Sequence, residues 1–163
     1  MNERIPALGK KQVTANFPKR PRDSHKSMFG TVAVIGGASG MIGAPLLAAR
    51  AALKLGAGCV HVGLLAENAP GVDLLQPELM LHSAKAALQL PDVDVFAIGC
   101  GLGTSIAAQK LLYEALMRNA ALVLDADALN LLARHADLQD DLRNRKTATM
   151  LTPHPGEAAR HCA

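Results

Sequence analysis

Short apolar runs alternate with longer amphipathic segments along most of the chain. The apolar runs are continuous rather than alternating with polar residues, which is typical of strands buried on both faces of a parallel sheet. We predict strands at residues 29–35, 59–65, 78–82, 93–98, 122–124 and 147–151, and helices at residues 44–55, 83–90, 104–118, 127–134 and from 155 onward. This order predicts one α/β domain, with a mostly parallel sheet covered by helices on both faces.

Glycine-rich turns follow two of the predicted strands. The first turn holds Gly37, Gly40 and Gly43, and the second is the segment 99–103, Gly-Cys-Gly-Leu-Gly. Glycines let backbone N–H groups approach an anion, and a following helix N-terminus favours negative charge. Both turns lie at carboxyl ends of strands, where open α/β sheets bind ligands. We therefore predict phosphate contacts at the three glycines of the first turn, with tight packing turns as the alternative. The first turn is not a P-loop, because no Gly-Lys-Ser/Thr follows it.

Two later motifs carry polar side chains at strand ends. Asp125, Asp127 and Asn130 follow one strand, and carboxylates there suit Mg²⁺, which binds few carboxylates together with phosphate oxygens. An aspartate helix cap is the alternative for this motif. His154 stands between two prolines, which fix the backbone around it, and Glu157 follows three residues later. We predict that His154 bonds a ligand and that Glu157 caps the helix or orients a water.

Composition and charge restrict the class of protein. The chain has 163 residues, 50% hydrophobic and 2% aromatic, so a folded core is expected and an aromatic platform for single-stranded nucleic acid is not. Residues 1–27 hold seven Lys or Arg and two acidic side chains. We interpret residues 1–24 as a basic N-terminal extension and residues 25–163 as the domain. The extension is either a solvated arm or an arm whose end, at residues 24–26, folds over an anionic ligand.

The cysteines and the hydropathy pattern bear on the compartment. Cys59, Cys100 and Cys162 are an odd, widely spaced set without metal-site spacing, which fits a reducing environment. We interpret Cys100 as a small buried residue rather than a nucleophile. No run of 18 apolar residues and no signal-peptide h-region occurs, so we expect a cytoplasmic protein without membrane or nucleic-acid partners.

Six segments, taken in order, resemble the ADP/ATP-dependent NAD(P)H-hydrate dehydratase family. These proteins are ribokinase-like and related to carbohydrate kinases. The matching segments are His25-Lys26 with Gly30, Gly36–Pro45, Ala52–Gly58, Gly99–Gly103, Leu124–Asn130 and Leu151–Glu157. This sequence departs from the family pattern at Cys100, where the family has proline. The resemblance implies a three-layer ribokinase-like fold.

The resemblance also implies a function. Family members restore NADH or NADPH from their hydrated (S) forms at the expense of ADP or ATP with Mg²⁺, by phosphorylating the hydroxyl group and losing it as phosphate. Carried over by position, Ala44, Gly103 and His154 would contact the hydrated dinucleotide. Asp125 and Asn130 would lie beside the phosphates or Mg²⁺. Family members form symmetric homo-oligomers, so we expect one here.

The family pattern continues beyond the motifs found in this chain. Its next elements are a Lys-Gly segment and a Gly-Ser-Gly-Asp loop, which carry the adenine-nucleotide site and the aspartate base. Neither element occurs among these 163 residues, so the sequence assigns no catalytic residue, and the family's base would lie beyond Ala163. We therefore expect a ribokinase-like fold that is incomplete at its C-terminal end and inactive alone. Apolar sheet surface should then be exposed, and the chain should self-associate.

Three other functions remain open from the sequence. A Rossmann-type NAD(P)-binding reductase would use the first glycine turn for pyrophosphate and Glu67 for ribose. Such a reductase needs Tyr-x-x-x-Lys, but Tyr113 is followed four residues later by Met117. A sugar or vitamin kinase of the ribokinase superfamily is the second alternative. The third is a domain without enzymatic activity that only binds copies of itself.

Overall fold

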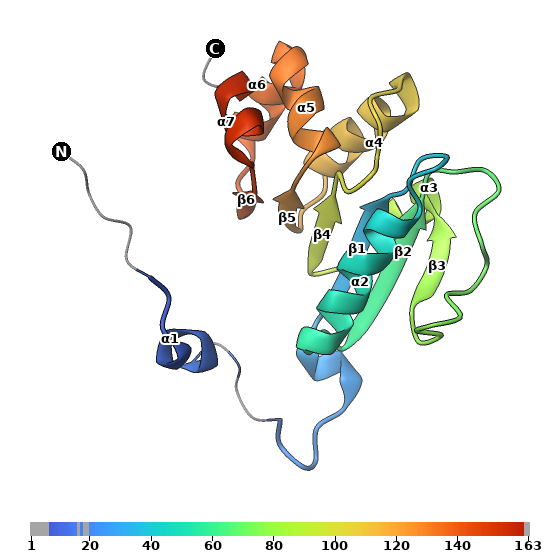
Figure 1. Cartoon of the computed structure of the whole chain (residues 1–163), viewed down its shortest axis with the longest axis vertical. Coiled ribbons are helices and arrows are strands. Elements are labelled where there is room, and N and C mark those ends of the chain that lie inside the picture. The colour runs from blue at the N-terminus through green and yellow to red at the C-terminus, as the bar shows by residue number, and fades with distance from the viewer. Residues whose placement is uncertain (1–6, 16, 18–19, 162–163) are drawn as a thin grey trace.

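A six-stranded parallel sheet forms the centre of the molecule (Figure 1). The computed structural model describes residues 7–15, 17 and 20–161. The sheet order is β3-β2-β1-β4-β5-β6, and every neighbouring pair is parallel. The strands are β1 (Thr31–Gly36), β2 (Cys59–Leu64), β3 (Met80–Ser83), β4 (Val95–Ile98), β5 (Ala121–Leu124) and β6 (Thr149–Leu151). All six predicted strands are therefore present, with ends shifted by a few residues.

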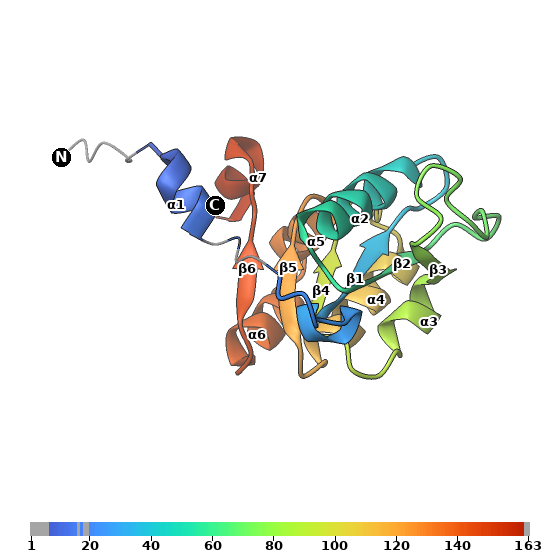
Figure 2. The ribbon, with the colours of Figure 1, turned by 90° about the horizontal axis from the view of Figure 1, so that it is seen from below.

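Helices cover the two faces of the sheet unequally (Figure 2). The α-helices are α1 (Lys10–Ala15), α2 (Gly43–Leu55), α3 (Ala84–Leu88), α4 (Ile106–Leu116), α5 (Asp127–Arg134), α6 (Ala136–Asn144) and α7 (Pro155–His161), and a 3₁₀ helix, η1, spans Lys26–Phe29. Buried residues of α3, α4 and α5 pack on one face with Phe96 and Leu122. Helix α2 packs on the other face, over Val34 and Val62. The arrangement confirms the predicted three-layer α/β class.

The layer that contains α2 leaves part of its face of the sheet uncovered. Ala97 and Val123 point to this face and are only half-buried, and Met150, which pairs with Val123, is 62% exposed. The neighbouring Leu151, on the edge strand β6, is 42% exposed. The predicted exposed apolar sheet surface is therefore present at β6. Self-association through it stays a prediction.

Local signals in the sequence account for most helix ends. The Ser105 side chain accepts the backbone N–H of Ala108 at 3.2 Å and caps α4. Gly56 ends α2 in the left-handed conformation, with φ of 113°. The short helices α1 and α6 were not predicted. Helix α6 was missed because it buries only Leu138 and is otherwise polar, so it lacks an apolar stripe.

Two predictions concern the last residues of the chain. Helix α7 begins at Pro155, as expected, and is described as far as His161. Cys162 and Ala163 lie outside the described residues. The prediction that the family's aspartate base lies beyond Ala163 therefore stays a prediction, and so does the boundary of the domain at residue 163.

The basic N-terminal segment lies away from the glycine turns. η1 leads directly into the beginning of β1, and the backbone N–H of Gly58, just before β2, donates to the Phe29 carbonyl at 3.2 Å. His25 and Lys26 therefore lie at the amino ends of the strands, opposite the turns (Figure 1). Residues 24–26 therefore lie away from the glycine turns of the same chain, and the prediction that they fold over an anionic ligand stays a prediction. Arg20 bonds the Gly56 carbonyl at 2.6 Å and stacks on Phe29, so a boundary at residue 24 cuts through a contact with the domain.

An ion pair holds the long connection between β2 and β3. Asp73 is 4% exposed and accepts two bonds from the Arg50 guanidinium of α2, both at 2.7 Å. A further bond comes from the backbone N–H of Leu75 at 3.1 Å. These bonds from Arg50, before all others, hold the pKa of Asp73 below its usual range. The bridge therefore fixes a loop whose Leu74 is 86% exposed.

We expect the loop at residues 65–79 to open only in strong acid. Because the folded pKa of Asp73 lies below the unfolded value of about 3.9, the bridge stabilises the fold above that value. The stabilisation is lost as the pH falls through the folded pKa. Hydrogen exchange of residues 65–79 should therefore rise below about pH 3.9, and Asp73→Asn should produce the same rise at pH 7. Equal exchange in Asp73→Asn and in the exposed control Glu78→Gln would contradict the role of the bridge.

Candidate functional site

Four segments meet at the carboxyl ends of neighbouring strands. They follow β1, β4, β5 and β6, and we call them together the strand-end cluster: residues 36–43, 99–103, 125–130 and 152–157. The sheet order reverses between β1 and β4, which is where open α/β sheets take up ligands. Every binding residue predicted from the sequence belongs to this cluster or to the first turn of α2.

The two glycine turns are joined through their backbones. The Gly37 N–H donates to the Cys100 carbonyl at 3.2 Å, and the Ala38 N–H donates to the Gly101 carbonyl at 2.7 Å. Gly101 has φ of 61°, and a Cβ there would lie 2.7 Å from the Met41 carbonyl oxygen and 3.3 Å from the Cβ of Ala44. Only glycine allows this approach. Ala44 therefore lies against the second turn, which contains Gly103.

The three glycines predicted to contact phosphate differ in their surroundings. A Cβ at Gly37 would lie 2.8 Å from Leu64 Cδ2, and the N–H of Gly37 already donates within the protein. Gly37 therefore serves the packing of the turn. Gly40 and Gly43 have no neighbour within 4 Å of a Cβ position, and Gly43 begins α2. The open side of this turn is therefore at Gly40 and Gly43, next to a helix N-terminus.

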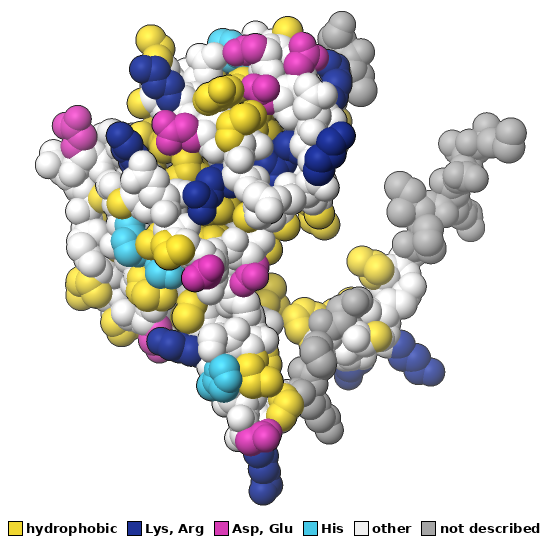
Figure 3. All heavy atoms as spheres, turned by 180° about the vertical axis from the view of Figure 1, so that it is seen from behind, with side chains coloured by type: hydrophobic (Ala, Val, Ile, Leu, Met, Phe, Trp, Pro, Cys, Tyr) yellow, Lys and Arg dark blue, Asp and Glu magenta, His cyan; other side chains and the backbone are white. Residues whose placement is uncertain are grey.

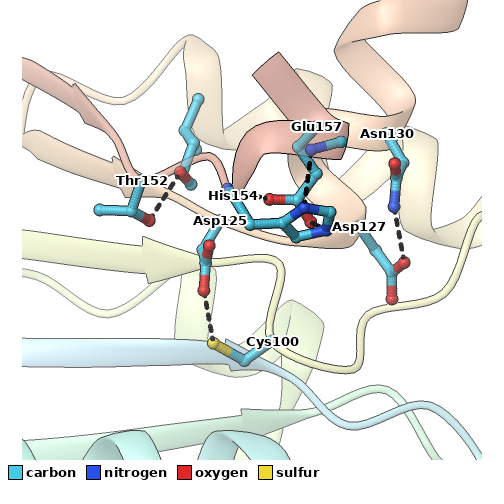
Figure 4. Close-up of polar contacts among 9 residues, drawn as sticks. Cys100, Asp125, Asp127, Asn130, Thr152, His154 and Glu157 are labelled. Carbon is cyan, nitrogen blue, oxygen red and sulfur yellow. Dashed lines mark hydrogen bonds and ion pairs between the residues drawn. The ribbon is translucent and has the colours of Figure 1, made fainter. Parts of the chain in front are cut away.

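Asp127 joins its own segment to the second glycine turn, and its contact with Asn130 is drawn in Figure 4. One carboxylate oxygen accepts the Gly103 N–H at 2.8 Å, and the other accepts the Asn130 side-chain amide at 3.3 Å. Its backbone N–H donates to the Gly99 carbonyl at 3.3 Å. From the sequence, Asp127 was a candidate Mg²⁺ ligand beside Asp125, and its contacts with Gly103 and Asn130 were not predicted. The missed signal is the spacing to Asn130, since a side chain three residues on in a helix lies beside it.

Asp125 points toward the second glycine turn. Its carboxylate accepts the Cys100 thiol at 3.8 Å (Figure 4). Burial first, and then the negative charge of Asp125, raise the pKa of the Cys100 thiol. The thiol therefore stays protonated at neutral pH and acts as a donor. The half-buried position of Cys100 agrees with a packing residue rather than a nucleophile.

The residue between the two aspartates is strained. Ala126 has φ of 47° and ψ of −114°, a conformation that usually needs glycine. Such a residue costs of order 1–3 kcal/mol, and strain of this kind concentrates at binding and catalytic sites. The N-cap of α5 is Ala126 itself, without a side-chain hydrogen bond, so the aspartate-cap alternative is not met there. The turn instead directs Asp125 to Cys100 and Asp127 to Gly103.

His154 is fixed in one orientation at the beginning of α7. Its Nδ1 accepts the Gly156 N–H at 3.1 Å, so the neutral ring carries its proton on Nε2. Nε2 lies 3.2 Å from one oxygen of Glu157, whose other oxygen accepts the His154 backbone N–H at 3.0 Å. Glu157 is 5% exposed, and it caps the helix as predicted. The His154 side chain is 63% exposed and faces outward from this support.

The donors of the cluster suit a metal ion that arrives with a ligand. Within the described part of the chain, no three His, Cys, Asp or Glu side chains are grouped for metal binding. Both oxygens of Asp127 are occupied by bonds, whereas Asp125 accepts only the long thiol contact among those described. Mg²⁺ binds through one or two carboxylates and phosphate oxygens. Asp125 therefore fits Mg²⁺ bound to a phosphate, but the described residues do not make a complete site.

A cavity of about 500 Å³ lies beside the first glycine turn. Its wall joins that turn to the end of β2 and the beginning of α4, and it is lined by Ala38, Ser39, Ile42, Leu65, Ala66, Glu67, Asn68, Ser105 and Ala107. This volume is within the range of small-molecule sites.

The described residues contain no helix that is long and apolar enough to cross a membrane.

Comparison with known proteins decides between the families that this geometry allows. The strand order 3-2-1-4-5-6 also occurs in dinucleotide-binding Rossmann domains, so it does not discriminate. The family model described as NAD(P)H-hydrate dehydratase matches residues 32–163. The chain belongs to the NAD(P)H-hydrate dehydratase family. The matched range contains the whole strand-end cluster.

Relatives in the NAD(P)H-hydrate dehydratase family come from several bacteria. The chain is 45% identical over 147 residues to the ADP-dependent (S)-NAD(P)H-hydrate dehydratase of Neisseria meningitidis, covering 88% of this chain and 49% of the relative. It is 40% identical to the bifunctional NAD(P)H-hydrate repair enzyme of Escherichia coli, covering 88% and 27%. The chain thus spans about half of the Neisseria dehydratase and a smaller share of the Escherichia enzyme.

Solved structures of the dehydratase family share the fold. The ADP/ATP-dependent NAD(P)H-hydrate dehydratase of Bacillus subtilis, co-crystallised with ATP and Mg²⁺, is 31% identical and superposes with a TM-score of 0.78, covering 99% of this chain and 56% of that one. A ribokinase-like protein of Enterococcus faecalis superposes with a TM-score of 0.73 at 28% identity, covering 89% and 52%. The ribokinase-like prediction is therefore confirmed, and the Rossmann reductase alternative is not supported.

Proposed function

We propose that this chain carries the hydrated-dinucleotide half of an (S)-NAD(P)H-hydrate dehydratase site. The observation that supports this most is the convergence of four family motifs at one sheet edge, around the contact between Ala44 and the second glycine turn. In this proposal Ala44, Gly103 and His154 contact the hydrated nicotinamide half. The backbone N–H groups of Gly40 and Gly43 donate to the pyrophosphate at the N-terminus of α2.

In this proposal each polar residue has a separate task. Asp127 holds the Gly103 turn in position through its bond to the Gly103 N–H at 2.8 Å. Glu157 and the Gly156 N–H engage the two ring nitrogens of His154 and fix the ring, whose exposed face would then pack against the hydrated nicotinamide. Asp125 would bind Mg²⁺ that is carried by a phosphate, and the Asn130 amide would hold Asp127 through its bond of 3.3 Å. In the reaction, phosphorylation turns the hydroxyl of the hydrated ring into a good leaving group, which departs as phosphate.

We propose ADP as the phosphoryl donor. The Neisseria relative, named ADP-dependent, is 45% identical, whereas the ATP-dependent relative of Entamoeba histolytica is 31% identical. The family's Lys-Gly segment and Gly-Ser-Gly-Asp loop, which would hold this nucleotide, do not occur in the sequence up to Ala163. Phosphoryl transfer depends on positioning and charge neutralisation, so the chain alone should bind the hydrate without converting it.

Calorimetry with the 163-residue chain and (S)-NADH hydrate tests the binding half of the proposal. We expect binding that His154→Ala weakens by about tenfold, since burying one side chain against a ligand is worth roughly 1.5 kcal/mol. His25→Ala, at the opposite edge of the sheet, is the matched control and should bind normally. Absence of hydrate binding by the unmodified chain would contradict the proposal.

A coupled assay tests the reaction. With (S)-NADH hydrate, Mg²⁺ and ADP, the chain alone should restore no NADH absorbance. A chimera extended with the remaining part of the Neisseria meningitidis relative should restore it. Restoration by the chain alone would show that the phosphoryl-transfer elements are not confined to the Lys-Gly and Gly-Ser-Gly-Asp segments. A folded, hydrate-binding chimera without turnover would contradict the assigned reaction.

A further inference from the structure

A second cavity adjoins the first on the side of β2 and β3. It has a volume of about 390 Å³, and it shares four lining residues with the cavity beside the first glycine turn, namely Leu65, Ala66, Glu67 and Ala107. The two cavities therefore form one continuous groove. We call one part of this groove the adenosine groove. It is the part lined by Leu64, Ala84, Lys85, Lys110, Leu111 and Glu114.

The groove has an apolar floor and a charged rim. Leu64 and Ala84 are each 2% exposed and Leu111 is 8% exposed, so they form a fixed floor. Lys85 of α3 and Lys110 of α4 are exposed at the rim. Among the described residues, neither lysine forms an ion pair with a carboxylate. Figure 3 shows basic and acidic side chains around apolar ones over these two helices.

The sheet order fixes the direction in which a bound dinucleotide must run. His154 follows β6, and Gly103 follows β4, so both lie on one side of the first glycine turn, which follows β1. The groove lies on the other side, at the ends of β2 and β3. A dinucleotide whose pyrophosphate meets Gly40 and Gly43, with its hydrated ring toward His154, therefore directs its adenosine into the groove. The apolar floor suits a planar base.

We propose that Lys85 and Lys110 bind the 2′-phosphate of hydrated NADPH and thereby favour it over hydrated NADH. This inference rests on the proposed function for the direction of the dinucleotide. The phosphate carries close to two negative charges, and two ammonium groups beside an apolar floor attract it. Glu114 stands four residues after Lys110 on α4, so it weakens this attraction. Glu67, at the junction of the cavities, is placed to accept ribose hydroxyl groups.

Affinity measurements on single-lysine variants test the inference. Lys85→Met and Lys110→Met should each weaken the binding of hydrated NADPH by about threefold, and the double variant by about tenfold. Binding of hydrated NADH should stay unchanged. Glu114→Gln should strengthen hydrated NADPH binding by about twofold, a gain that damage to the fold would not produce. Lys54→Met, an exposed lysine near the other end of α2, is the control.

The failure of this inference is distinct from failure of the proposed function. If both hydrates bind and the lysine variants bind them equally well, the groove does not read the 2′-phosphate and the proposed function stands. If neither hydrate binds, the proposed function fails, and adenosine 2′,5′-bisphosphate is then compared with 5′-AMP. Lysine-dependent preference for the bisphosphate supports the groove as a site for this group. Equal binding, or no binding, of the two nucleotides overturns it.

Discussion

Replacing Gly99 by alanine should destabilise the fold by about 3 kcal/mol or more. Gly99 directly follows β4 and has φ of 126°, and a Cβ there would lie 1.8 Å from the Asp125 carbonyl oxygen and 2.9 Å from the Cβ of Ala128. Its carbonyl also accepts the N–H groups of Leu102 and Asp127. The substitution therefore combines backbone strain with a collision against backbone atoms, which cannot turn away as a flexible side chain can.

Urea unfolding of three glycine variants measures this effect against matched controls. Gly40→Ala has a positive φ of 81° but open space around the new Cβ, so it should cost about 1–2 kcal/mol. Gly43→Ala has open space and lies at the beginning of α2, so its unfolding free energy should be unchanged or slightly raised. A cost for Gly99→Ala that equals that of Gly40→Ala would mean that the β4 and β5 turns do not pack as described.

The glycine and aspartate motifs show which parts of the fold and of the site could be predicted from the sequence. Their type and order predicted the sheet, the family and the edge at which the motifs meet. The sequence did not predict that the Gly37 N–H is bonded to the Cys100 carbonyl, because the partner lies 63 residues away and only the register of β1 against β4 brings it near. The central position of Asp127 was missed for the same reason. Its bond to Gly103 depends on the neighbouring strand.

Helices without an apolar stripe could not be predicted from the sequence either. Helix α6 is held by a single buried leucine, Leu138, so its hydrophobic pattern resembled a loop. The opposite placement of Lys26 and the glycine turns follows from chain direction, since Lys26 enters β1 and the turn leaves it. The sheet therefore separates the two ends. The adenosine groove could likewise not be predicted from the sequence, because Lys85 and Lys110 come from different helices.

Replacing Arg145 by methionine should cost about 3 kcal/mol, because it leaves several carbonyl groups without a donor. The Arg145 guanidinium bonds the carbonyl oxygens of Leu116, Arg118 at 3.0 Å and Ala120 at 2.7 Å, at the end of α4 and the approach to β5. It also bonds the Thr149 hydroxyl of β6 at 3.1 Å. One side chain therefore ties β6 to the end of α4.

The neighbouring Arg143 is the matched control for this change. Its side chain is 69% exposed and that of its ion-pair partner Asp140 is 68% exposed, so Arg143→Met should alter the unfolding free energy by less than about 0.5 kcal/mol. Arg145→Lys should lose most of the stability, since an ammonium group cannot bond carbonyl groups in several directions at once. Equal urea midpoints for Arg145→Met and Arg143→Met would contradict the role of Arg145.

The loss of the Arg145 side chain should also affect the proposed binding site. β6 leads directly into the segment that carries His154, and its edge position leaves β5 as its only strand neighbour in the described sheet. Without Arg145, hydrogen exchange should rise at residues 149–158 more than in β1 and β2, and the affinity for hydrated NADH should fall with it. Rising exchange spread evenly over all strands would instead mean that Arg145 supports the whole sheet, and β6 would not be the separately held element described here.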